Sequence, residues 1–87
     1  MLKDIVEVRA TGGYHLHLRF DDGVEGEIDL SEIIRFEGIF AVLKDHSQFE
    51  KVHVNSELGT ICWPNGADLD PDVLYAKLTG EQLPMVA

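Results

Sequence analysis

The chain has 87 residues and a mass of 9.7 kDa, which suits one small domain. Sixteen Asp and Glu residues outnumber seven Lys and Arg residues, so the net charge is −9 with neutral histidines. This charge argues against direct nucleic-acid binding, which usually needs a basic stripe. The 45% apolar content argues against disorder, and no apolar run approaches the ~20 residues of a membrane span. With no signal peptide apparent and one cysteine, Cys62, we expect a cytoplasmic protein without membrane or nucleic-acid partners.

Alternating apolar and polar residues predict three strands in the first third of the chain. The strands are expected over residues 5–10, 14–20 and 24–30. In the first of them, Val6, Val8 and Ala10 are expected to face inward.

The length of the turn between the second and third strands can be derived from the two apolar faces. A three-residue loop over 21–23 places Phe20 opposite Val24, and the apolar faces of both strands then coincide. A two-residue loop would set Phe20 against Glu25 and expose the apolar residues. The three-residue register therefore predicts three cross-strand pairs: Arg19 with Glu25, His17 with Glu27, and His15 with Asp29.

The period changes after Leu30. Ser31 is expected to cap a short helical turn. Residues 38–44 are expected to form a short amphipathic helix, and residues 45–50 a further helical turn with Phe49 inward. The residues expected to face inward at the first helix are Phe36, Ile39, Phe40 and Leu43.

The second half of the chain predicts two more strands and a final helix. Strands are expected over 51–55 and 60–63, and Asp70 is expected to cap a helix that starts at Pro71 and stops at Gly80. We therefore predict an α+β fold, in which a small antiparallel sheet of about five strands is packed by short helices. Residues 1–80 are expected to form this single domain, and 81–87 a loose tail.

Two histidines on one strand face raise the question of a metal site. His15 and His17 lie side by side, and imidazole is a common metal ligand. Asp29, Glu27 or His53 would have to complete the site. The alternative is a polar sheet face on which the histidines pair with the acids opposite, and it explains the alternation without a metal or any other cofactor.

Two other groups of residues have ordinary structural explanations. Asp68, Asp70 and Asp72 resemble the start of a calcium loop, but Val73 follows where such a loop needs glycine. Negative charge at a helix N-terminus explains them better. Cys62 lies in an apolar strand without a known nucleophile motif, so we interpret it as a buried core residue and expect no catalytic residues.

An acidic stretch is the remaining functional signal. Six acids fall within twelve residues that contain no Lys or Arg. One interpretation is a solvated hairpin that protects its own edge with charge. The other is a binding surface for a basic partner protein. The residues of this candidate surface are Asp21, Asp22, Glu25, Glu27, Asp29 and Glu32.

Three segments resemble the bacterial domain-of-unknown-function family 2442. They are a D-G-x-x-G-x-I/V-D-L hairpin at 22–30, a GIF-x-x-L-K-D segment at 38–45, and the specific segment W-P-N-G-A-D-L-x-P-x-x-L-Y at 63–75. Together they cover nearly the whole chain. A structural role accounts for the residues of the last segment, namely Trp63, Pro64, Asn65, Gly66, Asp68, Pro71, Leu74 and Tyr75.

The resemblance implies a small α+β domain with an antiparallel sheet. It carries over no catalytic residues, because none are established for the family. The resemblance also implies that some relatives carry a fused helix-turn-helix segment. We see no such segment in this sequence, so we do not expect direct DNA binding. Members are often encoded beside a small uncharacterised protein, and such pairs resemble toxin–antitoxin modules.

These observations leave three hypotheses. The first is a non-enzymatic, protein-binding or regulatory module of the bacterial cytoplasm, the acidic partner in a toxin–antitoxin-like pair, which binds a basic protein through the acidic stretch. The second is a small metal-binding or catalytic domain that uses His15, His17 and Asp29. The third is a homo-oligomer that forms through sheet edges or an apolar patch near Trp63.

Overall fold

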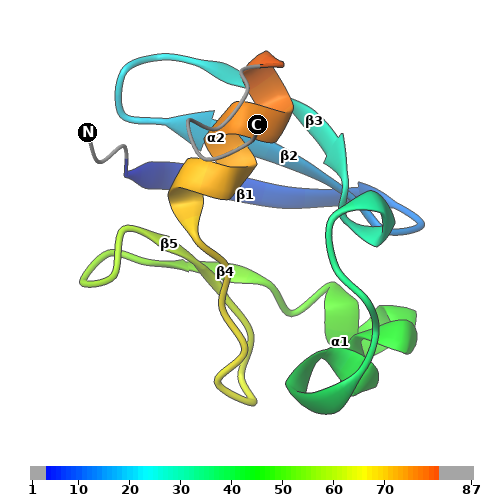
Figure 1. Cartoon of the computed structure of the whole chain (residues 1–87). Helices are drawn as coiled ribbons and strands as arrows, with labels where there is room; N and C mark the ends of the chain where they lie inside the picture. Colours follow the sequence, from blue (N-terminus) through cyan, green and yellow to red (C-terminus); the bar gives the residue numbers. More distant parts are fainter. Residues whose placement is uncertain (1–3, 81–87) are drawn as a thin grey trace, which may run out of the picture.

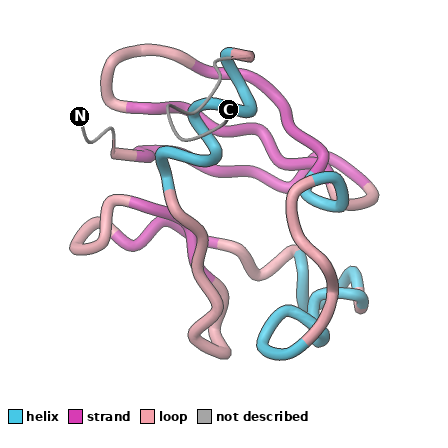
Figure 2. Tube along the Cα trace, in the orientation of Figure 1, coloured by secondary structure: helices cyan, strands magenta, loops and turns pink. Residues whose placement is uncertain are grey.

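Five antiparallel strands and several short helices make up residues 4–80, the part of the chain that this computed structural model describes (Figures 1 and 2). One sheet has the strand order β1-β2-β3, and β4 pairs with β5 in a second sheet. The α+β class with five antiparallel strands is thus confirmed, with the strands divided between two sheets. The elements are β1 (Ile5–Gly12), β2 (His15–Phe20), β3 (Glu25–Asp29), the 3₁₀ helices η1 (Leu30–Glu32) and η2 (Gly38–Lys44), α1 (His46–Phe49), β4 (His53–Asn55), β5 (Thr60–Cys62) and α2 (Pro71–Thr79).

The core lies where the two sheets and α2 meet. The second sheet lies beside β1, and the Ile5 N–H donates to the Gly59 carbonyl at 2.9 Å. In Figure 1, α2 crosses one face of the three-stranded sheet, and the η2–α1 segment lies at the far end of the second sheet. Large apolar side chains from both sheets and from the helices named above fill this core. The largest that are fully buried are Trp63, Phe20, Phe49, Ile5, Leu16, Leu18, Leu30, Leu43, Ile61 and Leu74.

The β2–β3 hairpin has the register that the sequence predicts. Phe20 N–H donates to the Val24 carbonyl at 2.8 Å across the three-residue loop. The pairs that follow along the two strands are Arg19 with Glu25, His17 with Glu27, and His15 with Asp29.

The inward orientation predicted for Val6 is wrong. A shift in register between Ile5 and Glu7 places two residues of β1 opposite one of β2. Such a bulge changes the face on which the following residues lie. Ile5 therefore enters the core beside Phe20, while Val6 is 45% exposed.

Ser31 is not the cap of η1. The Asp29 side chain accepts hydrogen bonds from both the backbone N–H and the hydroxyl of Ser31, at 3.0 and 2.6 Å. The helix thus begins one residue before Ser31, and the last residue of β3 caps it. A carboxylate that accepts two donors at a helix start performs the function predicted for the serine.

Ile39 also differs from expectation, because residues 38–44 form a 3₁₀ helix. With three residues per turn, side chains at i and i+3 lie on one face. Phe40 and Leu43 therefore face inward together. Ile39 and Val42 face solvent, with 51% and 41% of their surface exposed.

Helix α2 begins and ends as its sequence predicts. Asp70 accepts a hydrogen bond from the Asp72 N–H at 2.9 Å, and Pro71 occupies the first turn. Gly80 takes a left-handed conformation, with φ of 78°, and ends the helix. The tail expected over 81–87 lies outside the described residues.

The helices of residues 4–80 are all too short to cross a bilayer.

Candidate functional site: the acidic edge of the three-stranded sheet

Strand β3 forms an edge of its sheet and carries acids at every second position. Glu25, Glu27 and Asp29 share the outer face, while Gly26 and Ile28 face α2 and the core. Among the described strands, β3 pairs only with β2. We call Glu25, Glu27 and Asp29, with the open side of their strand, the acidic edge.

The hydrogen-bond pattern decides which backbone groups of β3 are open. Hydrogen-bonded and non-hydrogen-bonded pairs alternate along an antiparallel ladder. The Phe20–Val24 and Tyr14–Leu30 pairs are hydrogen-bonded, at 2.8 and 2.9 Å. The pairs that contain Glu25 and Glu27 are therefore non-hydrogen-bonded, and the N–H and C=O groups of these two residues point away from β2. Acidic side chains and open backbone groups thus belong to the same residues.

The neighbouring strand β2 presents only basic side chains to the outer face. Arg19 lies between Glu25 on β3 and Glu7 on β1, and its Nε donates to Glu7 at 2.9 Å. His17 lies opposite Glu27 but bonds diagonally to Glu25, with Nε2 and Oε1 2.9 Å apart. Glu27 has neither an ion pair nor a side-chain hydrogen bond to any residue between 4 and 80.

Asp29, at the end of the edge, is an ionised carboxylate at neutral pH. The Ser31 hydroxyl, which donates to it, lowers its pKa from the ordinary value of 3.8, and the Ser31 N–H and His15 act in the same direction. The His15 Nε2 lies 3.8 Å from an Asp29 oxygen. One oxygen of this carboxylate therefore accepts both Ser31 donors of η1, and the other oxygen faces His15 of β2.

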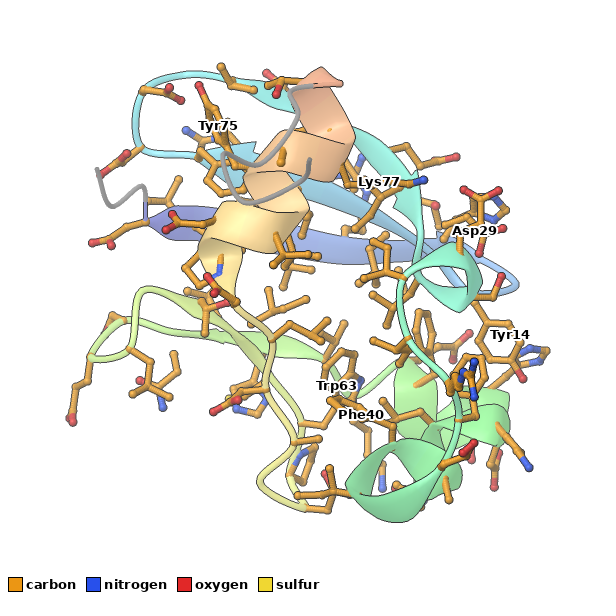
Figure 3. The ribbon with its side chains drawn as sticks, viewed as in Figure 1. Tyr14, Asp29, Phe40, Trp63, Tyr75 and Lys77 are labelled. Carbon is orange, nitrogen blue, oxygen red and sulfur yellow. The ribbon has the colours of Figure 1, made fainter. Side chains whose placement is uncertain are left out.

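The other three predicted binding acids lie beyond the two ends of β3, and two of them contact α2 through Tyr75 and Lys77, which are labelled in Figure 3. Asp22, in the β2–β3 turn, accepts a hydrogen bond from the Tyr75 hydroxyl at 2.7 Å. Glu32, beyond Asp29, pairs with Lys77 of α2 at 3.4 Å. Asp21 is exposed in the turn. These contacts tie both ends of β3 to α2, so the six acids do not form one continuous cluster.

The histidines do not assemble the metal site that the sequence left open. No group of three or more His, Cys, Asp or Glu side chains within the described residues is arranged to hold a metal ion. His15 points toward the Gly12 carbonyl and Asp29, whereas His17 points toward Glu25. His53 lies in the second sheet, opposite Cys62.

The aspartates before α2 have separate positions. Asp70 caps the helix, and Asp72 lies in its first turn. Asp68 precedes the helix and forms an isolated bridge to Cys62. The arrangement matches helix capping rather than a calcium loop.

The first residues of the motif at 63–75 hold segments together. The buried Trp63 donates its indole N–H to the Phe49 carbonyl at 2.9 Å. Asn65 donates to the Ile39 carbonyl at 2.9 Å and accepts from the Ala67 N–H at 3.1 Å. Gly66 has a φ of 93°, which closes the turn after the exposed Pro64.

The later residues of this motif attach α2 to the three-stranded sheet. Leu74 is fully buried, and Tyr75 packs edge-on against Phe20, with ring centroids 4.9 Å apart. With the hydroxyl contact to Asp22, Tyr75 therefore links the helix to the β2–β3 turn.

The comparisons with known proteins agree with this distribution of motifs. A family model described as a protein of unknown function, DUF2442, matches residues 5–80. No curated protein and no solved structure gives a significant match. The matched region contains every strand and helix described above, and on this basis the chain belongs to the DUF2442 family.

Proposed function

We propose that this chain is a non-enzymatic protein-binding module and that the acidic edge is its binding site. One observation carries the proposal: two exposed carboxylates, that of Glu25, which bonds to His17, and that of Glu27, lie beside open backbone groups along one strand edge. An extended segment of another protein that adds to such an edge gains backbone hydrogen bonds, and its alternate side chains give specificity.

The chemistry of the edge defines the partner. Residues directly opposite Glu25 and Glu27 in an added strand are two positions apart and lie on the same face. A complementary segment therefore carries Lys or Arg at every second position. The net charge of −9 steers such a basic segment toward the chain before contact.

The biological setting of this proposal follows from the family resemblance. The chain acts in the bacterial cytoplasm as the acidic, antitoxin-like member of a pair with a basic protein. Charge on the free edge has a second effect that suits this role, because it opposes pairing between two copies of the chain.

A peptide titration followed by NMR tests strand addition. The probe is a peptide of alternating Lys and Val, and the expected result is a set of shifts centred on β3 with slower exchange of the Glu25 and Glu27 N–H groups. A control peptide with the same charges carries N-methyl groups on alternate residues and cannot donate to the edge. Equal affinity of the two peptides would show that strand addition does not occur.

Charge reversal tests whether the edge itself is the binding site. The double variant Glu25→Lys/Glu27→Lys should weaken peptide binding by about tenfold or more, since exposed pairs contribute roughly 0.2–1 kcal/mol each and reversal adds repulsion. The matched control, Glu50→Lys/Glu57→Lys, changes the net charge equally at two exposed positions outside β3. Equal weakening by both variants contradicts the proposal, because binding would then depend on total charge alone.

A further inference from the structure

Cys62 and His53 form a pair on the outer face of the second sheet. They are directly opposite each other in β4 and β5, and Sγ lies 3.2 Å from Nε2. Ile61 and Trp63 on either side of Cys62 are core residues, so the Cys62 side chain projects to the opposite, outer face. Cys62 is 8% exposed, and the imidazole of the exposed His53 lies next to it.

The surroundings of His53 determine which ring nitrogen carries the proton. Nδ1 lies 3.2 Å from the Lys51 carbonyl, which can only accept a hydrogen bond. Nδ1 of the neutral ring is therefore protonated, and Nε2 accepts from the Cys62 S–H. An activated nucleophile needs a base within hydrogen-bond distance and a third group that orients the base. Here His53 is the base beside the Cys62 thiol, and the Lys51 carbonyl orients it.

We propose that Cys62 is a site of reversible modification by low-molecular-weight disulfides, with His53 as its base. The S–H proton passes to Nε2 as the sulfur attacks one sulfur of the disulfide. The new S–S bond joins Cys62 to half of the reagent, the old S–S bond breaks, and the other half leaves as a thiolate that takes up the proton. A second thiol reverses the reaction by the same steps.

Each side of Cys62 is flanked by an exposed residue, from which a small reagent can approach the sulfur. His53 lies on one side, and the bridge from Cys62 places Asp68 on the other; both residues are exposed. A metal is a poorer occupant, because these residues do not belong to any group of three ligands among residues 4–80. The adduct would lie on β5, away from the acidic edge on β3.

Glutathione disulfide is the probe for the experiment. The folded protein should gain one glutathionyl group in an intact mass spectrum and lose it again with excess reduced glutathione. His53→Gln, which keeps the size and a polar contact but not the base, should react about tenfold more slowly at pH 7, because an unassisted thiol is largely protonated there. The matched control is His46→Gln on α1, which should react like the parent protein.

The pH dependence separates a base from a merely structural neighbour. Between pH 6 and 8 the rate for His53→Gln should rise about tenfold per pH unit, as it does for an ordinary thiol, whereas the parent rate should change less. Two results would overturn the proposal. One is an adduct that forms only in urea, which would make Cys62 an inaccessible core residue; the other is the same rate and pH profile with and without His53.

Discussion

Asn65 shows how one side chain joins two distant parts of the chain. Its amide group donates to the carbonyl of Ile39, 26 residues earlier, and its oxygen accepts from the Ala67 N–H within its own turn. The contact connects the segment at 38–45 with the segment at 63–75, two of the three that carry the family resemblance. Asparagine suits this position because it offers a donor and an acceptor on one rigid group.

Replacing Asn65 should therefore destabilise the fold, and by more when both of its hydrogen bonds are lost than when one is. Asn65→Ala removes both bonds and should lower the free energy of unfolding by about 1–2 kcal/mol, whereas Asn65→Asp keeps the acceptor and should cost about 1 kcal/mol. Urea unfolding followed by the fluorescence of the buried Trp63 measures both. Glu50→Ala, at an exposed position, is the control and should change stability by less than about 0.5 kcal/mol. If both Asn65 variants match this control, the contact contributes nothing to stability.

At the scale of elements, the sequence pattern predicted the features that depend on residues close together in the chain. The β2–β3 register follows from a three-residue loop and two apolar faces that must coincide. The position of Val6 could not be predicted in the same way, because the bulge in β1 depends on how that strand meets β2. The contact between Cys62 and His53 was missed for a similar reason. The two residues are nine positions apart in the sequence, and only the β4–β5 register shows that they lie opposite each other. Pairing the two predicted strands across the loop at 56–59, as was done for the β2–β3 hairpin, could have revealed this contact.

The packing of α2 on β3 depends on a glycine. A Cβ at Gly26 would lie 2.7 Å from Cδ1 of Leu78, so the helix approaches the strand where the strand has no side chain. Gly26→Val should therefore destabilise the protein by about 1–3 kcal/mol despite the strand preference of valine. In a Leu78→Ala background, Gly26→Val should lower the free energy of unfolding by less. The difference between the two costs is the coupling energy, roughly 0.5–3 kcal/mol. Additive costs in this double-mutant cycle, measured by urea unfolding, would show that the two residues do not restrict each other.

At the scale of the whole molecule, three acids have a lowered pKa, and each has a hydrogen-bond donor beside it. A hydrogen bond from Arg19 lowers the pKa of Glu7 from 4.5, and hydrogen bonds from Ser31 and Ser47 lower the pKa values of Asp29 and Asp45 from 3.8. A carboxyl group whose pKa is lower in the folded state stabilises the fold above its unfolded pKa. That contribution disappears as the pH falls through the folded pKa. Unfolding in acid should therefore involve these three groups.

A serine double variant isolates two of these groups from the repulsion that accompanies a charge of −9. Ser31→Ala/Ser47→Ala removes the hydroxyls that donate to Asp29 and Asp45, at 2.6 and 2.8 Å, and leaves every charge in place. General repulsion therefore cancels in the difference between the two proteins. The parent should be more stable at pH 7, and its advantage should shrink as the pH falls below the ordinary aspartate value of 3.8, when the carboxylates become protonated in both states. Urea midpoints of both proteins, measured from pH 7 to pH 2, test this prediction. A stability difference that stays constant over the whole range would mean that the serines act through packing and not through the carboxylate charge.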